Sequence, residues 1–280
     1  MKKILFYALI FLASGIVTLS CSDDNDHLET FPIVGKTYNP APLITEQPDD
    51  AFSDPVIVQR PDILIWESTN KIVTSEGQPG SNVMDVINLM LAFAPIEGAD
   101  NYMDALQRSI RNISFLPDGN IQAEYVENLK EDKDDWKTSP KGIATYKVDS
   151  DSKLRLFLHL DEIKKTGLMT ESGTDGVAGL ILTLQDLLQN GISLTYSLDG
   201  HKLSVYLDKE TLLPILKKLK PLFQNTEFCN QMKEAANSAM PGMGMFINPI
   251  LDAIFRDLPS VIDGTTQLRI GLNLIEVKKE

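Results

Sequence analysis

The sequence predicts an α+β domain in which antiparallel β-hairpins form a meander and several amphipathic helices pack against it. A hairpin pattern with an Asp-Gly turn lies in residues 112–126, and two further hairpins with alternating apolar residues follow it. Apolar stripes at helical spacing lie before, between and after these hairpins. Helices and hairpins are interspersed without a run of parallel βαβ units, which is typical of α+β folds. A partly open, barrel-like sheet is one arrangement of such a meander.

The first part of the domain predicts three short strands and two helices. The strands are apolar runs set among prolines, which disfavour both helices and central strands. The helices carry apolar residues at the i, i+3, i+4 spacing of one helix face. The expected strands cover residues 31–38, 55–58 and 63–66, and the expected helices cover residues 81–94 and 99–110.

Three hairpins form the middle of the domain. The first turns at Asp118-Gly119, a dipeptide suited to a tight hairpin turn. The second and third share Gly-Ile, Tyr-x-(Val/Leu)-Asp and Lys-Leu-x-(Leu/Val)-(Phe/Tyr)-Leu, and a helical pattern follows each. Residues 142–166 and 191–223 are therefore either a duplicated hairpin–helix unit or two hairpins of one meander. Period 2 predicts that the following residues share a face within their hairpins: Leu154, Leu156, Leu158, Leu203, Val205 and Leu207.

More apolar stripes and a final alternating run complete the domain. The alternating run places an apolar side chain at every second position, which predicts a half-buried strand. The expected helices cover residues 177–188, 212–223, 226–240 and 246–258, and the expected strand covers residues 266–277. Residues 31–280 are thus expected to form a single α+β globular domain.

Residues 1–20 have the layout of a secretory signal, in which two lysines precede an apolar run too short to span a bilayer comfortably. Leu19-Ser20-Cys21 resembles the end of the lipobox of bacterial lipoproteins. Thr18 stands where that motif usually has Leu, a departure that the looser lipoboxes of Bacteroidota tolerate. The resemblance implies that Cys21 carries a lipid. A plain signal peptide with an incidental cysteine is the alternative.

An acidic tether follows in residues 21–30. Its first part, Ser22-Asp23-Asp24-Asn25-Asp26, resembles the acidic tag that directs Bacteroidota lipoproteins to the outer face of the outer membrane. The resemblance implies an outer-membrane protein that is held by its lipid and faces the cell exterior.

Composition and charge narrow the classes of partner. Hydrophobic residues make up 43% and charged residues 23%, as in ordinary globular proteins. The formal net charge is −13, and loss of residues 1–20 removes two lysines and no acid, which gives −15. An acidic surface repels nucleic acid and anionic lipid headgroups, so we expect neither as a partner. If Cys21 is lipidated, Cys229 has no cysteine to pair with, and we expect a buried, inert thiol.

Residues 112–161 carry a more specific resemblance. The Asp-Gly hairpin, the loop with Trp136 and the hairpin after it are similar to the meander of small lipocalin-like lipoproteins of Bacteroides. Taken whole, the chain resembles a domain-of-unknown-function family of surface lipoproteins from that group. This resemblance brings no catalytic residues with it.

The sequence contains no catalytic or metal-binding motif. Gly-x-Ser-x-Gly, His-Glu-x-x-His, Gly-x-Gly-x-x-Gly and the P-loop are all absent. The three histidines, His27, His159 and His201, lack zinc-ligand spacing. We therefore expect no catalytic residue, no metal and no cofactor. Glycosidase chemistry needs only two placed carboxylates, however, and 39 acidic residues do not exclude it.

Trp66 and Trp136 are the candidate ligand-binding residues, because an indole ring can stack on a sugar. Trp66 follows Ile65 in an expected strand, where a core position is the alternative. Trp136 lies in the charged loop 130–141, where it either packs back onto the domain or is available to bind a ligand. A group of methionines either forms an adaptable apolar surface or fills the core: Met240, Met243 and Met245.

Three functions fit these observations. The first is a non-catalytic surface lipoprotein that binds a glycan, a small apolar ligand or a partner protein. The second is a structural or accessory subunit of an outer-membrane complex, which would show a large exposed apolar patch. The third is a hydrolase of extracellular glycans, which would show a cleft with two carboxylates. The surface address and the missing catalytic motifs favour the first.

Overall fold

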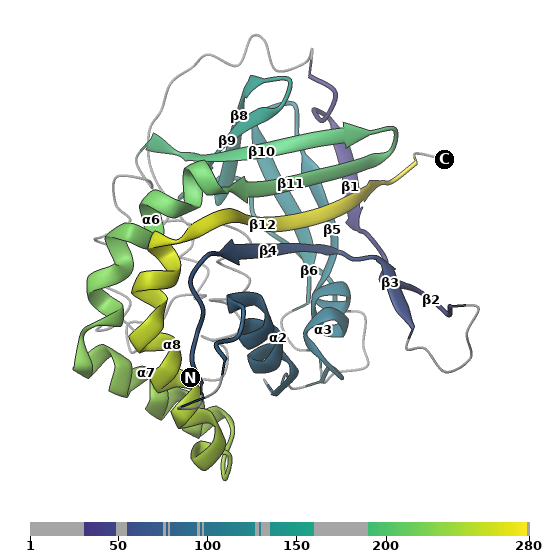
Figure 1. Cartoon of the computed structure of the whole chain (residues 1–280). Helices are drawn as coiled ribbons and strands as arrows, with labels where there is room; N and C mark the ends of the chain where they lie inside the picture. The colour runs from purple at the N-terminus through teal and green to yellow at the C-terminus, as the bar shows by residue number, and fades with distance from the viewer. Residues whose placement is uncertain are drawn as a thin grey trace.

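The computed structural model describes residues 31–48, 55–74, 77, 79–93, 96, 98–126, 129, 135–159 and 190–278. In these residues the chain is an α+β protein built around an antiparallel barrel of eight strands (Figure 1). The order around the barrel is β1, β5, β6, β8, β9, β10, β11 and β12, which returns to β1. Their bounds are β1 Lys36–Pro40, β5 Ile110–Phe115, β6 Asn120–Tyr125, β8 Ala144–Ser150, β9 Lys153–Leu158, β10 Ile192–Asp199, β11 Lys202–Asp208 and β12 Thr265–Glu276.

The barrel is closed, whereas the arrangement suggested from the sequence was a partly open, barrel-like sheet. β1 pairs with β5 along one edge and with the C-terminal end of β12 along the other. The register aligns Tyr38 with Glu276, and the ion pair between Lys36 and Glu276 measures 3.0 Å. The prediction was wrong because closure joins residues 240 positions apart, and alternation within one strand does not reveal its partner.

Three smaller pieces of sheet lie off the ring. β4 (Asp62–Ser68) pairs with the first part of β12, so β12 holds β11 along one edge and β4 and then β1 along the other. β7 (Lys137–Thr138) pairs with β6. β2 (Ile44–Glu46) and β3 (Val56–Gln59) form a separate two-stranded sheet beside the barrel (Figure 1).

Apolar side chains from all eight strands fill the barrel interior. The predicted alternation is confirmed, because Leu154 and Leu203 are fully buried there and the intervening residues face outward. The rings of Tyr38, Phe115 and Tyr146 pack edge to face in the middle, with centroid distances of 6.0 and 5.3 Å. Within the described strands the interior is therefore a packed core.

Helices cover one end of the barrel and the side of β4 (Figure 1). α6 packs Leu212 and Leu216 against Trp66 and Leu268, and its Ile215 reaches the barrel core. α8 packs against α2 beneath β4 and against α7 on another side. The described helices are α2 Val83–Phe93, α3 Tyr102–Ser109, α6 Lys209–Phe223, α7 Thr226–Ala239 and α8 Gly244–Asp263.

The last helix is longer than predicted. The prediction ended it at Leu258, before Pro259, but α8 continues to Asp263. A proline inside a helix loses one backbone hydrogen bond and strains the turn before it. Val261 and Ile262 are fully buried, and this burial outweighs the local cost of the proline.

Some predictions fall outside the described residues. They include the signal in residues 1–20, the tether in residues 21–30 and the helix expected at 177–188. The hairpins β8–β9 and β10–β11 are neighbours in one antiparallel sheet, and α6 follows the second hairpin as predicted. The end of the first unit, up to residue 166, is also outside the described chain, so the duplication stays a prediction.

Candidate functional site

Trp136 lies half-buried on the outside of the barrel, immediately before β7. Arg111 places its guanidinium over the Trp136 ring, 5.8 Å from the ring centroid, within the range of a cation–π contact. The segment 130–141 was predicted as a loop, but its β7 pairs with β6 and so extends the sheet. The indole therefore lies directly next to the strand that extends the sheet at β6.

A β-bulge in β5 brings Arg111 to the indole. Ile110 pairs with Tyr125 and Asn112 pairs with Glu124, so Arg111 is an extra residue that nothing in β6 opposes. Bulges redirect side chains in this way and are frequent next to functional sites. Arg111 Nε also lies 3.7 Å from Glu124 Oε2, so the guanidinium links the carboxylate to the ring.

Outward side chains of β5 and β6 add hydrogen-bonding groups to the barrel wall that carries Arg111. Asn112 Nδ2 donates to Glu124 Oε2 at 2.7 Å, and Gln122 Nε2 donates to Ser139 O at 3.0 Å. These positions alternate with Ile113 and other residues that face the core. We define the Trp136 site as Arg111, Asn112, Gln122, Glu124 and Trp136.

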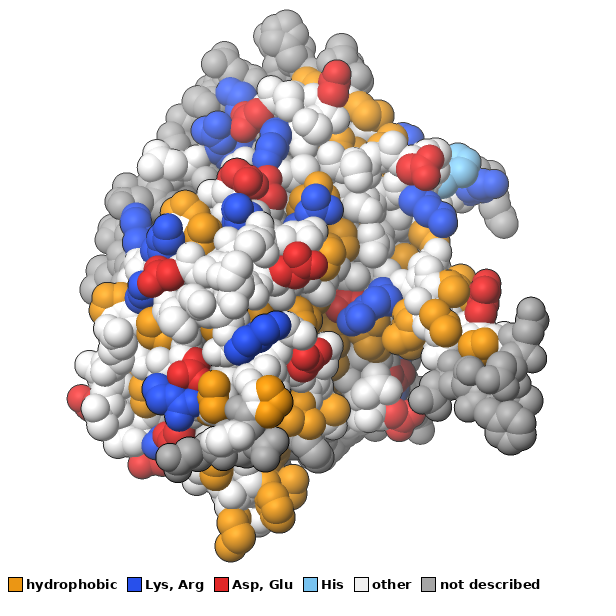
Figure 2. Space-filling model, viewed as in Figure 1, with side chains coloured by type: hydrophobic (Ala, Val, Ile, Leu, Met, Phe, Trp, Pro, Cys, Tyr) orange, Lys and Arg blue, Asp and Glu red, His pale blue; other side chains and the backbone are white. Residues whose placement is uncertain are grey.

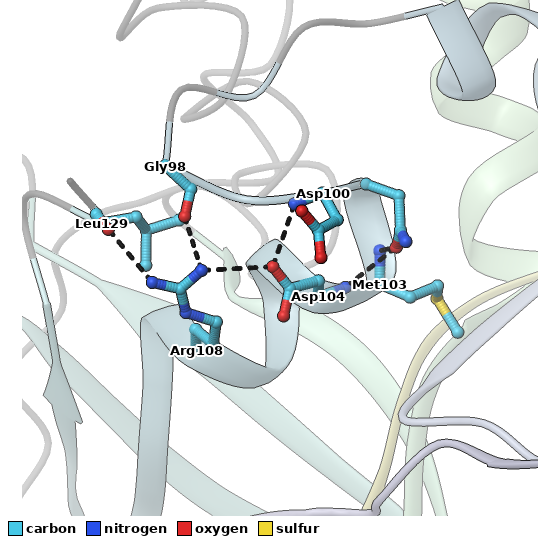
Figure 3. A network of polar contacts seen from close by, with 7 residues as sticks. Gly98, Asp100, Met103, Asp104, Arg108 and Leu129 are labelled. Carbon is cyan, nitrogen blue, oxygen red and sulfur yellow. Dashed lines mark hydrogen bonds and ion pairs between the residues drawn. The ribbon is translucent and has the colours of Figure 1, made fainter. Parts of the chain in front are cut away.

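Polar contacts fix the chain around the site to α3, which runs directly into β5 (Figure 3). Arg108 Nη1 donates to Gly98 O at 2.6 Å, and Arg108 Nη2 donates to Leu129 O at 3.1 Å. The ion pair between Arg108 and Asp104 measures 3.3 Å. Because Leu129 belongs to the connection that leads to Trp136, Arg108 ties both chain segments of the site to one helix.

Trp66 lies in β4 and packs into the core. Its ring contacts one apolar cluster with α2 and α8 and another with α6. Its indole N–H donates to Thr265 Oγ1 at 3.0 Å. The core position left open by the sequence therefore accounts for Trp66 without a ligand, and a ligand role for it stays a prediction.

A second polar surface lies where β11 enters α6. A hollow of about 430 Å³ there is bordered by β4, β11, β12 and the first turn of α6. Arg269 lies over the Tyr206 ring at 5.2 Å, and Glu67, Asp208 and Glu210 supply carboxylates. Several acids thus border one hollow, which the sequence did not predict.

Asp208 in this hollow is a structural carboxylate. It caps α6 by accepting from the Thr211 amide, and it accepts from Thr195 Oγ1 and Lys153 Nζ. Burial raises its pKa, but the hydrogen bonds from Lys153, Thr195 and Thr211 outweigh burial and lower the pKa to about 2. Asp208 is therefore ionised near neutral pH and is unsuited to act as a general acid there.

The remaining candidates are dispersed. Cys229 is half-buried rather than buried, its Sγ donates to Phe223 O at 3.3 Å, and burial raises its thiol pKa. An inert thiol fits this environment, because a raised pKa disfavours the thiolate. His159 contacts Thr145, whereas His201 contacts Glu276 in another part of the barrel. In the described chain, no three His, Cys, Asp or Glu residues gather as metal ligands.

Cys21 and His27 lie outside the described residues, so the lipid attachment at Cys21 stays a prediction. Comparison of the chain with protein-family models, curated proteins and solved structures gave no match. None of the helices in the described ranges has the length and apolar character needed to cross a bilayer.

Sequence reasoning found Trp136 but missed its neighbours. The polar alternation through Asn112, Gln122 and Glu124 was a readable signal for an outward face beside the tryptophan loop. Arg111 had no such signal, because its orientation depends on the bulge.

Proposed function

We propose that the protein is a lipid-anchored outer-membrane protein that faces the cell exterior and binds a glycan at the Trp136 site without catalysis. The lipobox-like Leu19-Ser20-Cys21 and the acidic residues after it support this address. The net charge of −13 argues against nucleic acid as the ligand.

The chemistry of the site favours a glycan over a small apolar ligand. The closed barrel is compatible with a lipocalin-like protein, and lipocalin barrels hold one small ligand inside. In the described strands, however, buried side chains such as Leu154 and Tyr196 occupy that interior. The Trp136 site instead combines a flat ring with guanidinium, amide and carboxylate groups, which suit a sugar face and its hydroxyls.

The bulge at Arg111 is the observation that carries the proposal. It interrupts the regular β5–β6 ladder, and it sets a cation, which also pairs with the Glu124 carboxylate, over an aromatic ring. A sugar stacked on this ring would gain a few kcal/mol at most, at about 25 cal/mol per Å² of apolar area before ordering costs. We therefore expect affinities in the micromolar range or weaker.

Fluorescence tests the proposal, because Trp66→Phe leaves Trp136 as the single tryptophan of the chain. Titration of this variant with neutral oligosaccharides should give a saturable change in emission, without product release. Arg111→Ala should weaken that response about tenfold, the equivalent of one charged hydrogen bond of roughly 1.4 kcal/mol. Arg155→Ala is the matched control, because Arg155 pairs with Asp149 in another hairpin.

Two results would overturn the glycan proposal. The first is a Trp136 emission that no oligosaccharide changes. The second is product release that persists in Trp136→Ala, which would favour the hydrolase instead.

Lipid attachment and surface exposure can be tested separately from ligand binding. Cys21→Ala should leave the protein without lipid and remove it from the outer-membrane fraction. Replacement of Asp23, Asp24 and Asp26 by Ala should protect the domain from protease added to intact cells. Partition of the wild-type protein into the aqueous phase of a detergent extraction would contradict the anchor.

The β2–β3 hairpin favours one alternative, an accessory subunit of an outer-membrane complex. Val56, Ile57 and Val58 are each about half exposed, and in the described chain β2 and β3 pair only with each other. An apolar strand that is open on both faces is a pairing surface unless something covers it. Loss of a co-purifying outer-membrane protein in Ile57→Lys, together with a Trp136 emission that no sugar changes, would favour this alternative.

A further inference from the structure

The junction of α7 and α8 ends in two exposed apolar side chains. Met245 and Phe246 are 84% and 66% exposed, the highest values among the large apolar residues of the described chain. Figure 2 shows apolar side chains that project from the lower end of the molecule in this view, below the helices. Such a pair becomes informative where charge is also missing around it, because exposed apolar patches mark contact sites for proteins or membranes.

The base of this junction is well packed. Met240 and Ile247 are buried, and Met243 packs against them between α7 and α8. An ion pair of 2.9 Å between Lys233 and Asp252 joins the two helices further along. The methionines thus divide between both roles left open by the sequence, with Met240 and Met243 in the core and Met245 on the surface.

Charge is absent from the whole junction. Residues 235–251 contain no Asp, Glu, Lys or Arg, although charged residues make up 23% of the chain. α8 also begins without a side-chain cap, whereas polar side chains cap α3, α6 and α7. The first turn of α8 therefore exposes apolar groups where capping residues are usual.

The charged residues nearest in the sequence define the length of the uncharged apex. Asp252 lies six residues after Phe246, and Glu234 lies six residues before Met240. At 1.5 Å per helical residue, about 9 Å of uncharged helix separates the apex from charge on either side. Apolar groups of interfacial helices reach about 5–10 Å into the headgroup and acyl boundary, and an uncharged apex of this length is long enough to reach the same depth.

We propose that the α7–α8 junction inserts Met245 and Phe246 into the interfacial region of a lipid bilayer. A projecting apex without charge fits lipid, whereas a pocket in a partner protein is usually framed by a polar rim. The net charge of −13 selects zwitterionic over anionic lipid, because an anionic surface repels the rest of the domain. This contact is independent of the Trp136 site and of the lipid at Cys21.

A tryptophan at the apex tests the depth directly. Phe246→Trp in the Trp66→Phe, Trp136→Phe chain carries a single fluorophore, and Val277→Trp in the same chain is the control at an exposed position after β12. With phosphatidylcholine vesicles, emission from position 246 should shift to the blue and be quenched by bromine on the acyl chains. Emission from position 277 should do neither. Phosphatidylglycerol in the vesicles should weaken the effect at position 246.

The measurement reports the position of residue 246, so it holds whether or not the N-terminus also binds the membrane. If the Trp→Phe background does not fold, the difference between Phe246→Trp and wild type gives the same reading in the native background. An unshifted and unquenched signal from position 246 would overturn the proposal and point to a protein partner. Equal quenching at positions 246 and 277 would also overturn it. Either failure leaves the sugar response of Trp136 unaffected, because that response is measured without vesicles.

Discussion

Two tyrosines of the barrel core form a matched pair for a stability test. Tyr38 and Tyr146 both pack edge to face against Phe115, so Tyr→Phe keeps the same ring at either position. The Tyr146 hydroxyl donates to Leu116 O at 2.9 Å, whereas the buried Tyr38 hydroxyl has no hydrogen-bond partner among the described residues. Burial raises the pKa of both phenols, so both stay neutral in ordinary buffers.

The two substitutions should have opposite signs. Tyr38→Phe removes a desolvated hydroxyl without breaking a bond and should raise the free energy of unfolding by about 1 kcal/mol. Tyr146→Phe breaks a hydrogen bond in the same cluster and should lower the free energy of unfolding by about 1 kcal/mol. Urea titration measures both, with a shifted midpoint at unchanged slope. Equal losses in the two variants would refute the argument, because Tyr38 would then make a hydrogen bond of ordinary strength.

Two caps give further tests. Asp208 has a folded pKa of about 2, below its ordinary value of 3.8, so its contribution to stability is present above about pH 4 and is lost as pH falls toward 2. The difference in unfolding free energy between wild type and Asp208→Asn should shrink across that window, and a constant difference would contradict the pKa assignment. Asn101 accepts from the amides of Met103 and Asp104, so Asn101→Ala should lower the unfolding free energy by about 1 kcal/mol in the same urea assay. Asn101→Ser, which keeps a capping oxygen, should retain most of that stability, and equal losses in both variants would argue against the cap.

Local patterns were sufficient for the hairpins but not for the closure of the barrel. The Asp118-Gly119 turn joins β5 to β6 as predicted, and Gly119 has a φ of 77°, which glycine adopts without strain. No local pattern shows that Tyr38 pairs with Glu276, because the two residues lie far apart in the sequence. In the same way, the residues of β4 and β1 do not reveal that both strands pair with one edge of β12.

The Trp136 site shows a second limit of prediction from the sequence. Trp136 could be selected by residue type alone, because an indole in a charged loop is unusual. Arg111 could not, since strict alternation from Asn112 would turn Arg111 toward the barrel interior. The bulge adds one residue to β5 and reverses that assignment. Pairing register, rather than composition, thus decides which charged residue meets the ring.

Gly271 shows how register also limits substitution, and it provides the last prediction. It lies in β12 beside β11, where an added Cβ would lie 2.1 Å from Val205 O and 2.5 Å from Tyr206 Cα. Both are backbone atoms of a paired strand, so Gly271→Ala must push β11 and β12 apart. Gly271→Ala should lower the free energy of unfolding by about 3 kcal/mol, at the upper end of overpacking costs. Gly200→Ala is the control, because Gly200 has a φ of +57° and open space around it, and only backbone strain of about 1 kcal/mol applies. Equal losses in urea titration would show that the β11–β12 contact yields more easily than its geometry implies.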